Sequence, residues 1–493
     1  MARIVIIGAG LSGLAAAARL ATIGHRVTVC EAASTYGGMV GRYERDGFAF
    51  DTGPGLLTLP AVYRDLALKT GKEPLEELVG LSPVDPESRH LFPDGTGLLL
   101  PNASRGGVAQ ALDAAFGAGS GERWSAVMNR GRTVWEATRR PLLEEPLPAS
   151  PEPLRTDPYP APPRRGLARL RRAPRTLADV AKHELGGHPG LTALLHEYAL
   201  RFGFDPAETP AGAAVLPYME QSFGVWYVRG GIRALADAVY GRCLKRRVEF
   251  RFDARVERVT TEGGRADGVE LADGSRLEAD LVVCSTDARL LAARGAGPAA
   301  SPGPDAPHAV PGRVGVLLAL RGARPTGVAH RTVVHAADPA AELASVFGGT
   351  ASLTDRPTVQ VLRPDDPSLH PQGHESVVLT ATTRSLGPAW SEPGLADRFA
   401  DAMLDHVDAA GLGLRERLLW RVVRTPQDTE RETGSPFGSV PRPALAGAGG
   451  SLLQAPNENL PGLYLVGGAA HPGGGLARVG MSASVTAGLI GPA

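Results

Sequence analysis

Three glycines near the amino terminus have the spacing of a turn that binds a dinucleotide phosphate. Within residues 8–13, Gly8 permits a tight turn, Gly10 lets the backbone approach a pyrophosphate, and Gly13 lets a helix lie close to the preceding strand. Leu11 and Ser12 fall where that helix begins, so its free N–H groups and the positive end of its dipole would face the phosphates. Such a glycine spacing is weak when it stands alone, and the surrounding elements decide its meaning.

The elements around the glycines are those that a dinucleotide site requires. Residues 3–7 form an apolar, β-branched run, an alanine-rich helical segment follows residue 13, and residues 25–30 form a second apolar run. Glu31 ends this second run, close to the roughly 20-residue offset at which a carboxylate accepts hydrogen bonds from ribose hydroxyls. Strand, turn, helix, strand and acid together predict a Rossmann-like domain that binds a dinucleotide.

Length, charge and cysteine content limit the other functions of the chain. Its 493 residues are too many for one core and predict two or three domains. Lys and Arg together number 52, as do Asp and Glu, so no net charge supports a nucleic-acid partner. The three cysteines lie far apart, which argues against paired thiols for redox or zinc chemistry.

One motif resembles a zinc-binding signature but has the wrong spacing. The pattern HExxxH is formed by His183, Glu184 and His188. This spacing is one residue too long to place both imidazoles on one helix face, so we predict no metal site.

A second group of motifs continues the nucleotide site and carries a family resemblance. Gly37 and Gly38 follow the acid at the spacing ExxxxxGG, and a hairpin over residues 42–50 leads into Asp51, Gly53 and Pro54. This pattern resembles the FAD-binding segment of the flavoproteins that include amine oxidases, protoporphyrinogen oxidases and carotenoid desaturases. The form DTGPGLLTLP is most similar to that of the carotenoid desaturases. The resemblance implies FAD as the dinucleotide, with these five residues among its contacts.

One position departs from the family pattern. The family commonly has Arg or Lys after the second glycine, whereas this chain has Met39. Arg42 is the candidate to supply the missing positive charge to the pyrophosphate. The departure also keeps open the hypothesis that the protein is not a working enzyme. In that case it is degenerate, or merely retains flavin, and serves as a scaffold in a biosynthetic complex.

The carboxyl-terminal segment is predicted to complete the cofactor site. Residues 462–468 form a strand that ends in Gly467 and Gly468, a glycine-rich bend reaches Gly475, and a helix runs from Met481 to residue 490. A helix that follows such a bend presents the positive end of its dipole to the flavin edge that becomes anionic on reduction. The residues HPGGG and MSAS closely resemble the flavin-ring motif of carotenoid desaturases.

Two residues of this segment are candidates for catalysis. His471 is a candidate base, and the alternative is that it and its proline and glycine neighbours only shape the bend. Arg478 stands in a stretch where many family members have Pro and then a small or apolar residue. It is a candidate to pair with the reduced flavin or with a polar end of the substrate, and the alternative is an exposed arginine.

The middle of the chain indicates how the domains are divided. Short strands between residues 248 and 284 return to the nucleotide-binding fold, and by resemblance Val256 lies where the backbone meets the adenine. Antiparallel strands with a covering helix near residues 395–409 predict an α+β substrate domain. We therefore predict an α/β fold of the glutathione-reductase and amine-oxidase type. Its predicted parts are an FAD-binding domain (1–75, 228–290 and 425–493), a substrate domain (76–138 and 291–424) and a proline- and arginine-rich loop with a helical insertion (139–227).

A proline-rich stretch with a basic end interrupts the chain between residues 139 and 175. Its prolines argue against a regular helix or a central strand. Arginines interleaved with leucines over residues 164–175 predict peripheral contact with an anionic membrane surface, and the alternative is a solvated loop. The first strand begins at Arg3 and no apolar run approaches the ~20 residues of a membrane span. We therefore expect no leader and a cytoplasmic location, on the inner face of the membrane where the basic segment binds it.

The predicted chemistry is the desaturation of a long isoprenoid. Residues 224–231, GVWYVRGG, resemble the carotenoid desaturases that act on 1-hydroxylated substrates. By this resemblance the protein is an FAD-dependent desaturase in which flavin N5 takes a hydride from a carbon beside a polyene, and oxygen or a membrane quinone reoxidises the flavin. The alternative is an FAD-dependent oxidase or dehydrogenase of the amine oxidase or protoporphyrinogen oxidase type that acts on a specialised metabolite.

Overall fold

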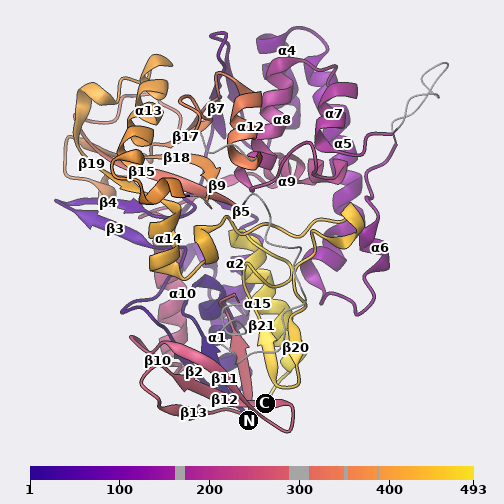
Figure 1. Ribbon diagram of the computed structural model, residues 1–493, viewed down its shortest axis with the longest axis vertical. Helices are drawn as coiled ribbons and strands as arrows, with labels where there is room; N and C mark the ends of the chain where they lie inside the picture. The colour runs from indigo at the N-terminus through magenta and orange to yellow at the C-terminus, as the bar shows by residue number, and fades with distance from the viewer. Residues whose placement is uncertain (162–172, 288–309, 349–352, 386–387) are drawn as a thin grey trace.

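The computed structural model describes residues 1–161, 173–287, 310–348, 353–385 and 388–493. Figure 1 shows a lower half that holds both termini and an upper half in which a larger sheet lies beside a group of helices. Most of the arginine-rich segment 164–175 lies outside the described residues, so its contact with a membrane stays a prediction.

A six-stranded sheet forms the centre of the lower half, and its strands come from distant parts of the chain. Its order is β10-β2-β1-β14-β21-β20, in which all neighbours are parallel except β21 and β20. The strands are β1 (Arg3–Ile7), β2 (Arg26–Cys30), β10 (Glu249–Arg251), β14 (Leu281–Cys284), β20 (Glu458–Leu460) and β21 (Leu463–Leu465). The predicted α/β class is confirmed for this half of the molecule.

Alternate residues of β1 face two different layers, because successive side chains of a strand point to opposite faces. Ile4 and Ile6 pack in the core formed with helices, whereas Val5 and Ile7 pack in the core formed with a three-stranded antiparallel sheet. The helices are α1 (Leu11–Thr22), α2 (Ala61–Gly71), α10 (Arg233–Lys245) and α15 (Leu476–Ile490), and the strands are β11 (Val256–Glu262), β12 (Arg265–Leu271) and β13 (Arg276–Glu278). Burial on both faces explains why residues 4–7 are continuously apolar.

A seven-stranded, largely antiparallel sheet forms the upper half. Its order is β19-β15-β18-β17-β16-β7-β8, and only β16 and β7 pair in parallel among these neighbours. Helix α13 (Leu395–Ala409) packs Phe399, Met403 and Val407 against this sheet, which confirms the predicted covering helix. The strands are β7 (Ser88–Leu91), β8 (Gly97–Leu100), β15 (Pro311–Arg321), β16 (Arg331–Val334), β17 (Val359–Leu362), β18 (His374–Arg384) and β19 (Leu418–Arg424).

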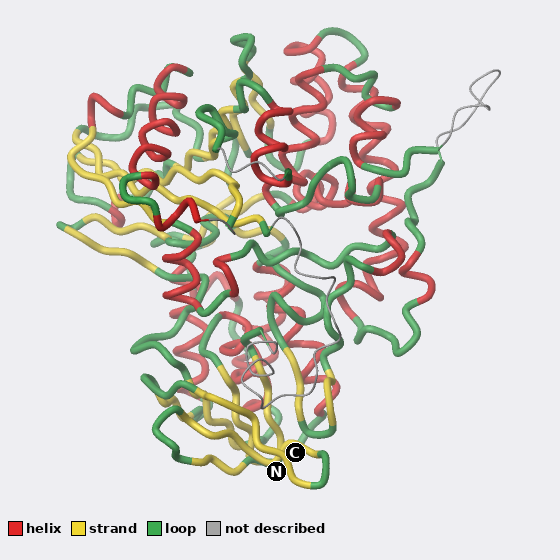
Figure 2. The backbone as a smooth tube through the Cα atoms, in the orientation of Figure 1, coloured by secondary structure: helices red, strands yellow, loops and turns green. Residues whose placement is uncertain are grey.

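Helices fill the other side of the upper half (Figure 2). They are α4 (Arg105–Phe116), α5 (Ser120–Arg139), α7 (Leu177–His183), α8 (Pro189–Arg201) and α9 (Val215–Phe223). His183 ends α7, whereas His188 caps α8 by accepting the Leu191 N–H at Nδ1, so the two imidazoles belong to separate helices. None of the described helices combines the length and the apolar character needed to cross a bilayer.

Two short helical turns in the proline-rich stretch correct the expectation of no helix there. Helix α5 continues into a π-helical turn, η1 (Arg140–Glu144), and α6 (Glu152–Arg155) forms a further turn. Pro141 is the second residue of η1 and Pro153 is the second residue of α6. In the first turn of α6 the missing N–H of Pro153 removes no helical hydrogen bond.

Small elements join the two halves. The predicted hairpin is present as β3 (Arg42–Arg45) and β4 (Phe48–Asp51), and a three-stranded sheet has the order β5-β9-β6. Its strands are β5 (Leu57–Thr58), β6 (Leu81–Pro83) and β9 (Val225–Val228). This small sheet brings the GVWYVRGG motif beside the segment that follows the DTGP motif.

Candidate cofactor and substrate site

The two amino-terminal glycine motifs meet at the start of α1. Gly37 forms an isolated parallel bridge with Gly10, and its N–H donates to the Ala9 carbonyl at 2.9 Å. A Cβ added to Gly38 would lie 3.1 Å from the Cα of Gly10. The backbones of the two motifs therefore lie as close together as glycine permits.

Gly13 and Gly10 differ in their surroundings. A Cβ added to Gly13 would clash with the carbonyl oxygen of Gly8, so α1 can pack on β1 only with glycine here. A Cβ added to Gly10 would meet no heavy atom within 4 Å, and the φ of Gly10, −66°, is one that any residue adopts. Gly10 is also the N-cap of α1, whose first-turn N–H groups have no partners within the helix. The open space beside Gly10 thus fits the phosphates of a dinucleotide.

Glu31 is held beside this glycine turn by backbone N–H groups. Its carboxylate accepts from Ala9 at 2.6 Å and from Ala33 at 2.9 Å. The Glu31 carbonyl accepts from Ala254, two residues before Val256 begins β11, which brings the segment assigned to the adenine next to the acid. The acid assigned to the ribose and the backbone assigned to the adenine thus lie at the same end of the sheet as the glycines.

Asp51 accepts hydrogen bonds from the protein itself, and its role as a contact of the cofactor stays a prediction. Its carboxylate accepts from the N–H groups of Ile232 at 2.8 Å and Arg233 at 3.3 Å, at the start of α10. Burial raises the pKa of Asp51 to about 6, although these two hydrogen bonds act in the opposite direction. A Cβ added to Gly231 would lie 2.7 Å from the carboxylate. Asp51 therefore positions the GVWYVRGG motif against the DTGP motif.

Gly53 and the neighbouring Pro54 lie against the turn that contains Met39. A Cβ added to Gly53 would clash with the Met39 carbonyl oxygen, so this glycine is required by a close backbone approach. Arg42, the candidate for the missing charge, forms an ion pair with Glu44 at 2.7 Å.

Arg233 is a cation near the glycine turn that the sequence reasoning missed. Its Nη1 donates to the Tyr36 carbonyl at 2.8 Å and would lie 2.9 Å from a Cβ added to Gly37. Nε of Arg233 donates to the Asp237 carboxylate at 2.8 Å, which orients the guanidinium. No spacing rule links residue 233 with residue 37, because the packing of α10 brings them together.

The carboxyl-terminal glycines close on the same helix from another side. A Cβ added to Gly467 would lie 2.9 Å from Oγ of Ser12 in the first turn of α1, and one added to Gly468 would lie 2.8 Å from Pro441. Gly475 is the N-cap of α15 with a φ of 110°, and Met481 lies one turn and a half further along, partly buried against the helical core. The structure thus brings both chain ends together around the start of α1.

His471 is buried in this carboxyl-terminal bend and has one unused ring nitrogen. Nε2 lies 3.1 Å from the Glu145 carbonyl, an acceptor, so Nε2 carries the proton and Nδ1 does not. Nδ1 is buried with no partner among the described residues. The backbone carbonyl of His471 accepts hydrogen bonds from Asn457 at 2.8 Å and from Ser482 at 2.7 Å, which fixes the backbone. This orphaned acceptor suits a donor supplied by a bound group.

We expect a His471→Gln variant to lose less stability in acid than the wild type. Burial lowers the pKa of His471 from 6.5 to about 4, so only the unfolded chain takes up this proton between those pH values. Stability from this group is therefore lost as the pH falls, by about 3 kcal/mol between pH 6.5 and 4. Urea unfolding of the two proteins across this range measures the difference, with His183→Gln as the control because the His183 side chain is exposed. Parallel pH profiles for wild type and His471→Gln would contradict the burial of a neutral imidazole.

An open pocket lies between the helices of the upper half and the start of α15. Its walls come from α5, η1, α9, residues 444–446 and α15. Most of the lining side chains are apolar, including Trp135, Leu142, Leu143, Val215, Met219 and Leu445. None of the lining residues is acidic, whereas Arg139 and Arg478 are basic. The pocket therefore suits a hydrocarbon with a neutral or electron-rich end.

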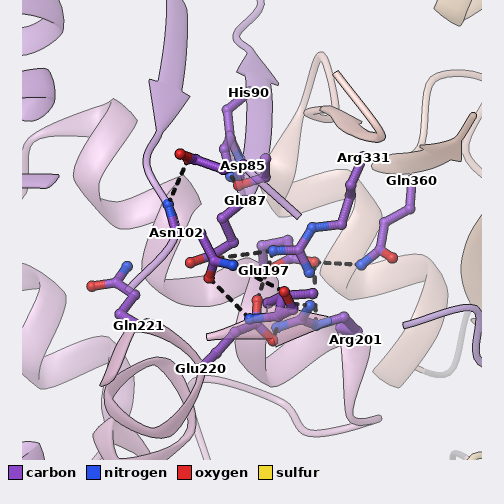
Figure 3. Close-up of polar contacts among 12 residues, drawn as sticks. Asp85, Glu87, His90, Asn102, Glu197, Arg201, Glu220, Gln221, Arg331 and Gln360 are labelled. Atoms are coloured by element: carbon purple, nitrogen blue, oxygen red, sulfur yellow. Dashed lines mark hydrogen bonds and ion pairs between the residues drawn. The ribbon is translucent and has the colours of Figure 1, made fainter. Parts of the chain in front are cut away.

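Figure 3 shows a buried ionic cluster to which α9 contributes Glu220. Glu220 accepts from Arg201 at 3.0 Å and from Arg331 at 2.7 Å, and Arg331 also donates to Glu87 at 3.0 Å. Burial raises the pKa of Glu220, but the charges of Arg201 and then Arg331 outweigh it and hold the pKa below the usual range. Burial and the nearby Glu220 raise the pKa of Glu87. The signal in the sequence for this cluster is a charge within an otherwise apolar strand, as at Arg331 in β16.

Comparisons with known proteins agree with this geometry. The model of a family described as flavin containing amine oxidoreductase matches residues 11–487. A 4,4'-diapolycopene oxygenase from Methylomonas sp is 28% identical over 491 residues, which cover 97% of this chain and 96% of that one. A hydroxyneurosporene desaturase from Rhodobacter capsulatus is 29% identical over 495 residues, with coverages of 96% and 94%. Among solved structures, a putrescine oxidase bound to putrescine has a TM-score of 0.66 at 16% identity, over 99% of this chain and 98% of that chain, a likeness of fold alone.

Proposed function

The chain belongs to the flavin containing amine oxidoreductase family, and from this premise we propose that it is an FAD-dependent desaturase that introduces C=C bonds into a carotenoid or a related long isoprenoid. The observation that carries this proposal is the apolar pocket at the start of α15, the helix that follows the carboxyl-terminal glycine bend. Relatives of nearly the same length are named for the oxidation of carotenoids, which supports the substrate class.

The described residues supply binding and positioning for this reaction. Gly10 leaves room for the phosphates, Gly37 and Gly38 let the second turn pack against it, Glu31 is proposed for the ribose, and Arg233 adds a positive charge near the turn. Bound FAD would supply a hydride acceptor for the oxidation of a C–C bond. The apolar walls of the pocket keep water away from the hydrocarbon, and a polyene delocalises the positive charge that develops when hydride leaves it. The reaction therefore requires little more than a weak base.

Oxygenation of a carotenoid end group is the second candidate function. It is favoured by the match to a 4,4'-diapolycopene oxygenase over 97% of this chain. Oxidation of an amine is disfavoured, because the pocket lining contains two arginines and no acid that would attract an ammonium group.

We also propose that electrons leave the flavin to oxygen or to a membrane quinone. The described residues form one six-stranded nucleotide-binding sheet, and a second one of this kind for a nicotinamide cofactor is not among them. Peripheral binding of the basic segment to an anionic membrane would bring the protein close to both the quinone and the lipid-soluble substrate.

Anaerobic reduction of the purified holoenzyme tests the proposed function. We expect the visible absorption of oxidised flavin to bleach on addition of liposomes that contain phytoene or a hydroxylated carotenoid, with red-shifted polyene products after admission of air. Liposomes without carotenoid, and with putrescine instead, provide the controls. Bleaching by the amine but by no carotenoid would contradict the proposal.

A further inference from the structure

Arg478 brings a positive charge to the pocket with no acidic partner among the described residues. Its Nη2 donates only to Sδ of Met219, at 3.6 Å, a weak acceptor. Burial lowers the pKa of its guanidinium to about 10, and no neighbouring carboxylate opposes this shift. Arg478 is partly buried, and a cation withdrawn from water without a counter-ion destabilises the protein that contains it. A ligand that supplies an acceptor would remove this cost.

The position of Arg478 in α15 adds a second unfavourable interaction. It lies in the first turn of the helix, three residues after the N-cap Gly475, where the helix dipole is positive. A Cβ added to Gly475 would lie 3.8 Å from Nη1 of Arg478, so the guanidinium lies close to the start of the helix. An electron-rich group bound here would interact favourably with both the arginine and the helix N-terminus.

We propose that Arg478 determines substrate specificity by binding an acceptor oxygen at the end of the isoprenoid that occupies the pocket. This inference rests on the proposed function, because it assumes that the apolar pocket binds an isoprenoid. The preferred end group is a carboxylate, followed by a carbonyl and then a hydroxyl, because the carboxylate neutralises the partly buried charge and can accept two parallel hydrogen bonds. A plain hydrocarbon end leaves the cation unpaired and is bound most weakly.

Arg139 offers a matched control in the same pocket. It also lines the cavity, but its side chain is 49% exposed and forms an ion pair with Glu144 at 3.2 Å. Because water and Glu144 already compensate the charge of Arg139, an acceptor on the ligand should add little to binding there.

Binding of a retinoid series to the oxidised holoenzyme tests this role. The probes share one polyene chain and end in methyl, hydroxymethyl, aldehyde or carboxylate, and their absorption or the quenching of tryptophan fluorescence reports affinity. We expect the wild type to bind the carboxylate about tenfold or more tighter than the hydrocarbon. In Arg478→Met this preference should fall to about twofold or less, while Arg139→Met keeps it. Arg478→Lys should keep part of it, because the ammonium retains the charge and loses the planar pair of donors.

Three outcomes would overturn the proposal. They are a wild type without end-group preference, an Arg478→Met variant that keeps the preference, and a shift of the flavin reduction potential in Arg478→Met without any change in retinoid selectivity. Visible flavin absorption and the melting temperature confirm that each variant is folded, and we expect neither to fall in Arg478→Met because the replaced cation lacks a partner. Binding needs no turnover, so a carboxylate preference without flavin bleaching by carotenoids would support this inference and contradict the proposed desaturation.

Discussion

Replacing Gly10 by alanine is expected to remove FAD while leaving the protein folded. The φ of −66° accommodates alanine, and the added Cβ meets no heavy atom of the protein within 4 Å. Loss of the favourable N-cap residue costs at most about 1 kcal/mol of stability. The Cβ would instead occupy the open space at the start of α1 that we assign to the pyrophosphate. Steric exclusion there should lower the affinity for FAD by on the order of 100-fold.

The Gly13→Ala variant provides the contrast. Its Cβ would clash with the Gly8 carbonyl oxygen, so α1 must separate from β1 and the protein itself is destabilised, by about 3 kcal/mol or more. The ratio of flavin to protein absorbance after purification, and calorimetry of the apoproteins, measure both effects. A Gly10→Ala variant that retains one flavin per chain would show that the phosphates lie elsewhere.

The amino-terminal part of the site could be predicted from sequence because its determinants are local. The glycine spacing in residues 8–13, the apolar run in residues 3–7 and the turn at Asp46 and Gly47 each act within a few residues of the chain. Proline was less informative. It removes a donor only where a helix needs one, and in the first turn of a helix, as at Pro153 in α6, it is tolerated.

The role of individual charges could not be predicted, because it depends on packing between distant segments. Asp51 lies in a cofactor motif but accepts from the first N–H groups of α10, some 180 residues later in the chain. Arg233 reaches the glycine turn through the same packing. The sequence showed that Arg478 was unusual for its position. Only the structure shows that it lines an apolar pocket and that no acid of the described part of the chain pairs with it.

Removal of the Glu220 carboxylate should be among the most destabilising single changes in the upper half. Arg201 lies on α8, Glu220 on α9 and Arg331 on β16, so this one carboxylate links two helices to the large sheet. Glu220→Leu leaves two buried guanidinium groups that share the remaining acids, and we expect a loss of about 3–5 kcal/mol in the free energy of unfolding. Chemical unfolding followed by circular dichroism measures it. Glu220→Gln, which keeps an acceptor but not the charge, should lose less.

A surface glutamate provides the control for the substitution, and the pocket provides a second readout. Glu136→Gln in α5 breaks an exposed pair with Arg132, at 2.8 Å, which contributes about 0.5 kcal/mol or less. Equal losses for Glu136→Gln and Glu220→Gln would mean that the buried cluster does not link the helices to the sheet.

Met219 lines the pocket and directly precedes Glu220 in α9, so release of α9 from the cluster also displaces a wall of the pocket. Retinoid affinity should therefore fall in Glu220→Leu for every end group alike, whereas Arg478→Met changes only the discrimination between them.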